Sequence, residues 1–222
     1  PTYLIEMLRK FNVVPSRIGG VTVVAADFDA PTERMTSIIP LLYQSGYITI
    51  KDYDGMSELY TLDIPNREIR IGLMRSLLPN YITDPQPGNT TVAKMSVAIR
   101  QGDMDGALQL LQEFLLTVPY CDNTDHEGHY QQMLYIIFSL LGYYVDVEVR
   151  TPRGRVDMVL RTATTVYVME LKLGSAGEAM RQIDLKDYPS RFLLSGLPVV
   201  KLAVGFDRER RTLGSWEIRK AD

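Results

Sequence analysis

The run Val166-Tyr-Val-Met169 leads directly into Glu170-Leu171-Lys172, and this junction constrains the fold more than any other segment of the chain. An unbroken apolar run with β-branched residues is typical of a strand that is buried on both faces. Ionisable groups at such a place are costly to bury without a purpose. The junction therefore predicts a buried strand with charged side chains at its end.

A second carboxylate precedes Glu170 by thirteen residues. Asp157 also belongs to an apolar, β-branched segment, and the two segments are predicted to be neighbouring strands, each with its acid at the strand end. Glu170 and Lys172 point the same way because alternate residues share one face of a strand. We therefore expect Asp157, Glu170 and Lys172 to meet where the two strands end.

Two carboxylates and an ammonium group suit the metal-dependent cleavage of a phosphodiester bond. Mg²⁺ takes hard oxygen ligands and keeps several waters, so Asp157, Glu170 and the Leu171 carbonyl would make an adequate cradle. The cation would lower the pKa of a bound water, while Lys172 steadies that water or the scissile phosphate. The alternative is an ordinary ion pair on a half-exposed sheet, and the apolar run before Glu170 favours the catalytic interpretation.

Residues 125–222 are predicted to form an α/β domain with a central mixed sheet. Its pattern predicts helices and strands in the order α-β-β-β-α-β-β, over residues 127–141, 144–150, 155–161, 165–173, 176–188, 199–206 and 213–218. Helices that flank a sheet in this way are typical of the α/β class.

Residues 1–83 are predicted to form a smaller, mainly helical domain. Two strands, 47–51 and 58–62, flank the hairpin signal Asp54-Gly55, and helices are expected over residues 2–11, 33–45 and 68–78. The combination suggests a winged-helix-like module, which could bind DNA or only mediate packing. Packing is favoured because the helix over 68–78 is not strongly basic.

Residues 84–124 are predicted to be a linker and a helical connector. The segment Asp84-Pro-Gln-Pro-Gly-Asn89 is the clearest linker signal, and helices are expected over 91–101 and 105–116. The chain begins with Pro1 rather than methionine, so we expect a C-terminal fragment of a longer protein.

Charge and composition set further bounds. The net charge of −3 lacks the strongly basic footprint of a tight nucleic-acid binder. No apolar run approaches the ~18 residues that span a bilayer, and a cytoplasmic location is expected. A local basic cluster flanks the two carboxylates, or is simply a solvated surface; it comprises Arg150, Arg153, Arg155, Arg181, Lys186 and Arg191.

The motifs resemble those of the PD-(D/E)XK nuclease superfamily, whose fold is restriction-endonuclease-like. Residues 125–222 look like the branch fused to an AAA-ATPase-like region in bacterial proteins, many from Bacteroidetes-type genomes. The matching motifs are Glu127 with Tyr130 and Gln131, Gly154-Arg-Val-Asp157, Glu170-Leu-Lys172, and Gln182 within the helix that runs from Ala179 to Tyr188. The family's proline before the strand acid is replaced here by Val156.

The resemblance implies roles for these residues. Glu127, Asp157 and Glu170 would ligate or orient Mg²⁺, or Mn²⁺ in its place. Lys172 would act in catalysis, and Gln182 would contact the metal-bound water or a backbone phosphate. His126 and His129 are interpreted as residues at the rim of the site, because a metal-binding pair on a helix is more often four residues apart.

The first 83 residues resemble, more weakly, the winged-helix-like end of the AAA-ATPase-like region. No Gly-x-x-x-x-Gly-Lys-Ser/Thr motif occurs in the 222 residues, so any ATP site of a parent protein would lie upstream. Two hypotheses follow. One is a Mg²⁺-dependent nuclease that cleaves DNA as the effector module of a larger ATPase-linked protein. The other is a catalytically silent nuclease-fold module that binds nucleic acid or a partner protein.

Overall fold

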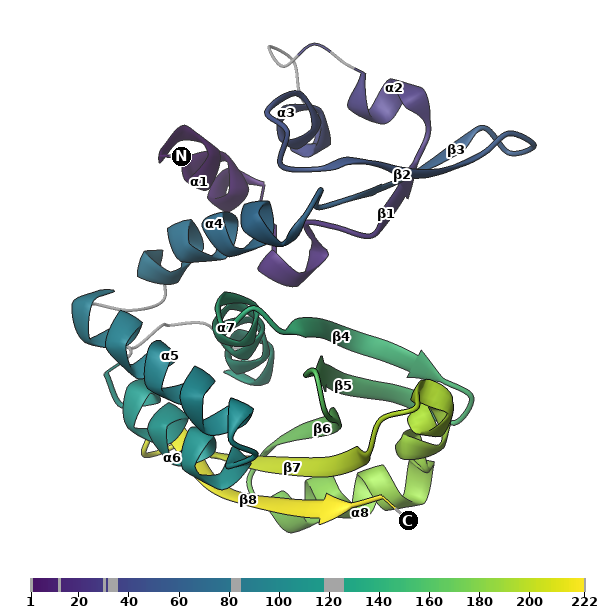
Figure 1. The fold of residues 1–222 in the computed structure, drawn as a ribbon. Coiled ribbons are helices and arrows are strands. Elements are labelled where there is room, and N and C mark those ends of the chain that lie inside the picture. The colour runs from purple at the N-terminus through teal and green to yellow at the C-terminus, as the bar shows by residue number, and fades with distance from the viewer. Residues whose placement is uncertain are drawn as a thin grey trace. The chain divides into compact units, whose positions relative to one another are not determined.

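The structure is a computed structural model, and it describes residues 2–11, 13–29, 31, 36–80, 85–117 and 126–221. The chain divides into two compact units, Pro1–Leu77 and Leu78–Asp222, which are considered one at a time (Figure 1). The boundaries expected at residues 84 and 125 stay predictions. Among the described residues, no helix has both the length and the apolar character that crossing a bilayer requires.

The first unit combines short helices with a three-stranded antiparallel sheet in the order β1-β3-β2. Its elements are α1 (Thr2–Lys10), η1 (Pro15–Arg17), β1 (Val21–Val23), α2 (Ala25–Phe28), α3 (Ile39–Gln44), β2 (Thr49–Asp54), β3 (Leu59–Asp63) and α4 (Arg67–Leu77). The Asp54 carboxylate accepts hydrogen bonds from Met56 N and Ser57 Oγ, which closes the β2–β3 hairpin at the predicted turn. The winged-helix-like assignment stays a prediction.

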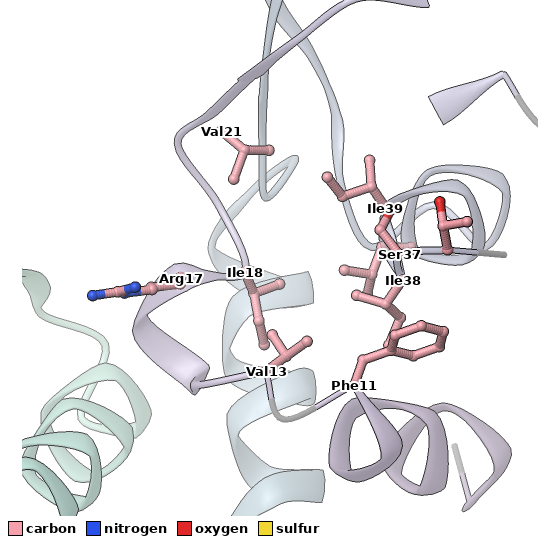
Figure 2. A pocket seen from close by; sticks show the side chains of 10 residues that line it. Phe11, Val13, Arg17, Ile18, Val21, Ser37, Ile38 and Ile39 are labelled. Atoms are coloured by element: carbon pink, nitrogen blue, oxygen red, sulfur yellow. The ribbon is translucent and has the colours of Figure 1, made fainter. Parts of the chain in front are cut away.

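A cavity of about 280 Å³ lies within the first unit (Figure 2). Phe11, Ile18 and Ile38 face one another across it, whereas the Arg17 side chain points away from them. The described residues that line it include no carboxylate, imidazole or thiol. This cavity therefore carries none of the chemistry that the sequence predicts for residues 125–222.

The second unit is built on a five-stranded sheet in the order β4-β5-β6-β7-β8. The β6–β7 pair is parallel and the other pairs are antiparallel, so the sheet is mixed. Its elements are η3 (Leu78–Asn80), α5 (Pro85–Arg100), α6 (Met104–Leu115), α7 (His126–Leu140), β4 (Tyr144–Thr151), β5 (Gly154–Arg161), β6 (Val166–Leu173), α8 (Ala176–Lys186), η4 (Tyr188–Ser195), β7 (Val199–Asp207) and β8 (Thr212–Lys220). The predicted α/β class with a central mixed sheet is confirmed.

The central strand β6 is buried from Val166 to Leu171, as its apolar sequence predicts. Helix α7 packs against β4, β5 and β6, and α8 packs against β6, β7 and β8 (Figure 1). The Ser175 side chain accepts a hydrogen bond from Glu178 N and so caps the start of α8. These contacts fix the carboxyl end of β6 between the two helices.

The linker predicted at Asp84–Asn89 is wrong for its described part, because α5 begins at Pro85. Proline is tolerated in the first turn of a helix, where its missing N–H would have no partner within the helix. Helix α5 packs against α6, and α6 packs against β8. The predicted connector helices therefore belong to the second unit.

Candidate active site

The sequence interpretation placed Asp157 at the end of its strand. In the structure it lies in the first half of β5. Strands β5 and β6 are antiparallel, so the beginning of β5 lies beside the end of β6. The register pairs Met158 with Met169, which makes Asp157 and Glu170 the next residues on their strands. Strand direction thus brings the two acids together.

The backbone of Leu171 takes part in this junction. Its N–H donates a hydrogen bond of 2.9 Å to Asp157 Oδ2. The N–H and C=O of one strand residue point toward the same neighbouring strand, so the Leu171 carbonyl also faces the β5 side. The carbonyl that was predicted as a metal ligand therefore faces the strand that carries Asp157.

Glu170 is completely buried, with 0% of its surface exposed. Its Oε1 lies 3.4 Å from Lys172 Nζ and accepts a hydrogen bond from Gln182 Nε2. Its Oε2 has no hydrogen-bond partner among the described residues. A buried carboxylate oxygen without a partner is unfavourable, and a cation would satisfy it.

The electrostatics of the site disfavour two ionised carboxylates. Burial raises the pKa of Glu170 to about 7; the charge of Asp157 adds to the rise, and that of Lys172 opposes it. Burial also raises the pKa of Asp157, against the lowering effects of the Leu171 N–H and of Lys172. A divalent cation would reverse this preference, because an opposite charge stabilises the ionised form.

The side chains present fit such a cation. Mg²⁺ is usually bound through one or two carboxylates, with waters and substrate phosphates completing its coordination. Asp157, Glu170 and the Leu171 carbonyl would supply oxygen ligands of this kind. Within the part of the chain that the structure describes, no group of three or more His, Cys, Asp and Glu side chains is placed to hold a metal.

The predicted third ligand, Glu127, lies in the first turn of α7, and its side chain is outside the part that the structure describes, as are those of His126 and His129. Four residues further along α7, Gln131 Nε2 donates a hydrogen bond of 3.0 Å to the backbone oxygen of Asp157. Residues four apart lie on the same face of a helix. The contact of Gln131 thus joins α7 to the β5 residue that carries the first carboxylate.

The roles of two contributors to the site, Tyr188 at the end of the matched helix segment and Glu148, escape the sequence interpretation. The Tyr188 hydroxyl donates to the Arg155 oxygen at 2.8 Å and accepts from Gln182 Nε2 at 3.4 Å. A buried tyrosine needs a partner for its hydroxyl, but the sequence does not say which one. Glu148 adopts a φ of 52° in β4, and its charge adds to the rise in the pKa of Asp157. No sequence signal marks Glu148.

The predicted basic cluster is partly neutralised by acidic side chains. Arg155 Nη1 lies 3.2 Å from Glu148 Oε1, and Arg153 Nη1 lies 3.7 Å from Asp187 Oδ2. Both arginines are more than half exposed. These two arginines of the cluster therefore belong to a mixed-charge surface.

Comparison with known proteins gives two matches. Residues 125–216 match the family model described as the PD-(D/E)XK nuclease superfamily. The chain is also 29% identical over 223 residues to a protein from Azotobacter chroococcum mcd 1 described as "Uncharacterized protein in vnfD 5'region". That alignment covers 96% of this chain and 43% of the relative, so the chain spans less than half of the relative's length. No solved structure matches.

Proposed function

From the PD-(D/E)XK nuclease superfamily domain at residues 125–216, we propose that this protein is a Mg²⁺-dependent nuclease that cleaves phosphodiester bonds of DNA. One observation carries the proposal. Glu170 is fully buried beside Asp157 and Lys172, and one of its oxygens has no partner among the described residues. A divalent cation accounts for this arrangement, whereas an ordinary surface ion pair does not.

Each residue has a role in this proposal. A bound divalent cation supplies a water of lowered pKa and neutralises charge at the phosphate. Asp157, Glu170 and the Leu171 carbonyl would hold the cation, with Glu127 as a further ligand and Mn²⁺ as a possible substitute. Lys172 is 29% exposed, so its ammonium group can reach an attacking water or a phosphate oxygen.

Gln182 receives a different role from the one that the resemblance implies. Its Nε2 donates to Glu170 Oε1, so the amide already has a protein partner. We infer that Gln182 orients Glu170, as side chains hydrogen-bonded to metal ligands commonly do. Direct contact with the metal-bound water or with a backbone phosphate becomes the secondary role.

We further propose that the domain acts inside a larger, ATPase-linked cytoplasmic protein. The similarity to a relative more than twice as long supports a larger parent protein. The ATPase link comes from the resemblance of residues 1–83 to the end of an AAA-ATPase-like region. The upstream region of such a parent would be the partner of this chain. DNA would be the substrate of this chain.

The second candidate is a catalytically silent module that binds nucleic acid or a partner protein. It is favoured by the pairing of Arg153 and Arg155 with acidic side chains, which leaves less positive charge for a phosphate backbone. The net charge of −3 points the same way. Cleavage assays separate the two candidates.

The test is cleavage of plasmid and of single-stranded DNA with Mg²⁺, Mn²⁺ or EDTA. We expect cutting that requires a divalent cation and that falls below detection in Lys172→Ala, because the variant keeps both carboxylates but loses the ammonium group. Lys220→Ala, which removes an exposed lysine at the end of β8, is the matched control. Equal cutting by Lys172→Ala would refute the assigned role of Lys172, and no cutting by the wild-type protein would favour the silent module.

A further inference from the structure

The hydrogen-bonded ladder between β5 and β6 stops just before the two carboxylates. Its paired residues run from Arg161 and Val166 to Met158 and Met169. Asp157 and Glu170 therefore lie where the two strands are no longer held together by ladder hydrogen bonds. Other contacts must set the separation of the strands at the proposed metal site.

Among the described residues, two hydrogen-bonded bridges between side chain and backbone span this opening. The first is the 2.9 Å hydrogen bond from Leu171 N to Asp157 Oδ2. The second starts at the Arg155 oxygen on β5, passes through the Tyr188 hydroxyl and the Gln182 amide, and ends at Glu170 on β6. Gln182 Nε2 donates to both Tyr188 and Glu170, so both hydrogens of its amide are used. The second bridge thus ties the strand of one acid to the carboxylate of the other.

The surroundings of Tyr188 hold its hydroxyl in this position. The residue is only 1% exposed and follows Asp187, which ends α8 with a φ of 47°. Gly154 approaches the hydroxyl closely, since a Cβ there would lie 3.3 Å from the hydroxyl oxygen. Gly154 also has a φ of 153°, a backbone conformation that residues with a side chain rarely adopt. Glycine therefore leaves room for the tyrosine to reach Arg155.

We propose that Tyr188 is a positioning residue that sets the separation of Asp157 and Glu170, and thereby makes the site selective for a small divalent cation. This inference rests on the proposed metal-dependent function. Mg²⁺ demands near-ideal octahedral geometry with ligands at about 2.0–2.1 Å, whereas Ca²⁺ accepts irregular geometry at about 2.3–2.6 Å. Loss of one of the two bridges would alter the separation of the two carboxylates. It would therefore weaken Mg²⁺ binding more than Ca²⁺ binding.

The experiment compares the two cations in Tyr188→Phe, which removes the hydroxyl and keeps the buried ring. The dissociation constants of Mg²⁺ and Ca²⁺ are measured by isothermal titration calorimetry without nucleic acid. Loss of a side chain that supports a metal ligand typically weakens metal binding 10- to 100-fold, so we expect about a tenfold loss for Mg²⁺. The loss for Ca²⁺ should be several-fold smaller.

Tyr167→Phe is the matched control, because Tyr167 is another buried tyrosine, lies near the start of β6 and makes no contact with the two carboxylates among the interactions described above. Its ratio of Mg²⁺ to Ca²⁺ affinity should equal that of the wild-type protein. Circular dichroism establishes that each variant is folded. If Tyr188→Phe does not fold, Gln182→Ala breaks the same bridge one link later and should shift the ratio in the same direction.

The possible failures are distinguishable. In one outcome, the wild-type protein binds both cations, and the folded variant that breaks the bridge keeps the wild-type ratio of Mg²⁺ to Ca²⁺ affinity. This outcome would overturn the role of Tyr188 and leave the proposed function intact. Equal losses for Mg²⁺ and Ca²⁺ would also overturn it, since they indicate general loosening. A wild-type protein that binds neither cation would overturn both proposals.

Discussion

At the scale of the residue, Glu170 links the stability of the fold to the chemistry of the site. Its carboxylate is fully buried, and only Oε1 has partners among the described residues. Burial raises its pKa from 4.5 to about 7. Without a divalent cation, ionisation of this one group therefore opposes folding.

A pH dependence of stability follows. The folded protein binds more protons than the unfolded chain between pH 4.5 and about 7, because the folded pKa of Glu170 is the higher one. The contribution of Glu170 to the free energy of unfolding is fully present below this window and is lost as the pH rises through it. The loss is on the order of 3 kcal/mol.

Urea unfolding of the wild-type protein and Glu170→Gln, in EDTA at about pH 5 and about pH 8, measures this loss. The variant carries no titrating group at position 170, so its stability relative to the wild type should increase at the higher pH. The same difference between the two proteins at both pH values would show that Glu170 has no raised pKa.

At the scale of the element, sequence patterns located most of the second unit. The strand predicted over 165–173 is observed as Val166–Leu173, and the helix predicted over 127–141 is observed as His126–Leu140. Both succeed because an apolar run or a helical apolar stripe is a local property of the chain. The association of Glu170 with Lys172 has the same origin, since the two residues are only two positions apart on one strand.

The features that the sequence patterns did not predict depend on contacts between distant segments. Prolines at 85 and 87 indicate a linker locally, but α5 extends through them and packs on α6. The placement of Asp157 depends on the antiparallel direction of β5 and β6, which its own sequence does not encode. The Tyr188 hydroxyl bonds to a carbonyl 33 residues earlier in the chain, so no spacing rule could assign its role.

The docking of α6 on β8 gives a prediction at this scale. Gln112 Nε2 donates to the backbone oxygen of Leu213 at 2.5 Å. Thr212 Oγ1 donates to the backbone oxygen of Gln112 at 2.6 Å. Gln112→Ala leaves the backbone oxygen of the buried residue Leu213 without this donor, which should lower the free energy of unfolding by about 1–3 kcal/mol. Urea unfolding measures the change.

Gln109→Ala is the control on the same helix, because Gln109 is exposed and bonds only to Asp105 among the contacts that the structure gives it. Its effect should stay within about 0.5 kcal/mol. Equal effects of the two substitutions would indicate that the contact between α6 and β8 adds nothing to the stability of the second unit.

At the scale of the whole molecule, the residues of the proposed metal site all belong to the second of two compact units. The superfamily match covers residues 125–216, whereas the similarity to the longer relative covers 96% of the chain. The first unit is thus shared with that relative but carries none of the superfamily motifs.

The measurement that tests the central claim most directly is the rate of plasmid cleavage as a function of Mg²⁺ concentration. It compares the wild-type protein with Glu170→Gln, which keeps the size of the buried side chain but removes its negative charge. Glu178→Gln, an exposed position on α8, is the matched control. We predict saturable, Mg²⁺-dependent cleavage by the wild type and the control, and none by Glu170→Gln. Cleavage that needs no divalent cation, or that Glu170→Gln performs as fast as the wild type, would contradict a metal site built on Glu170.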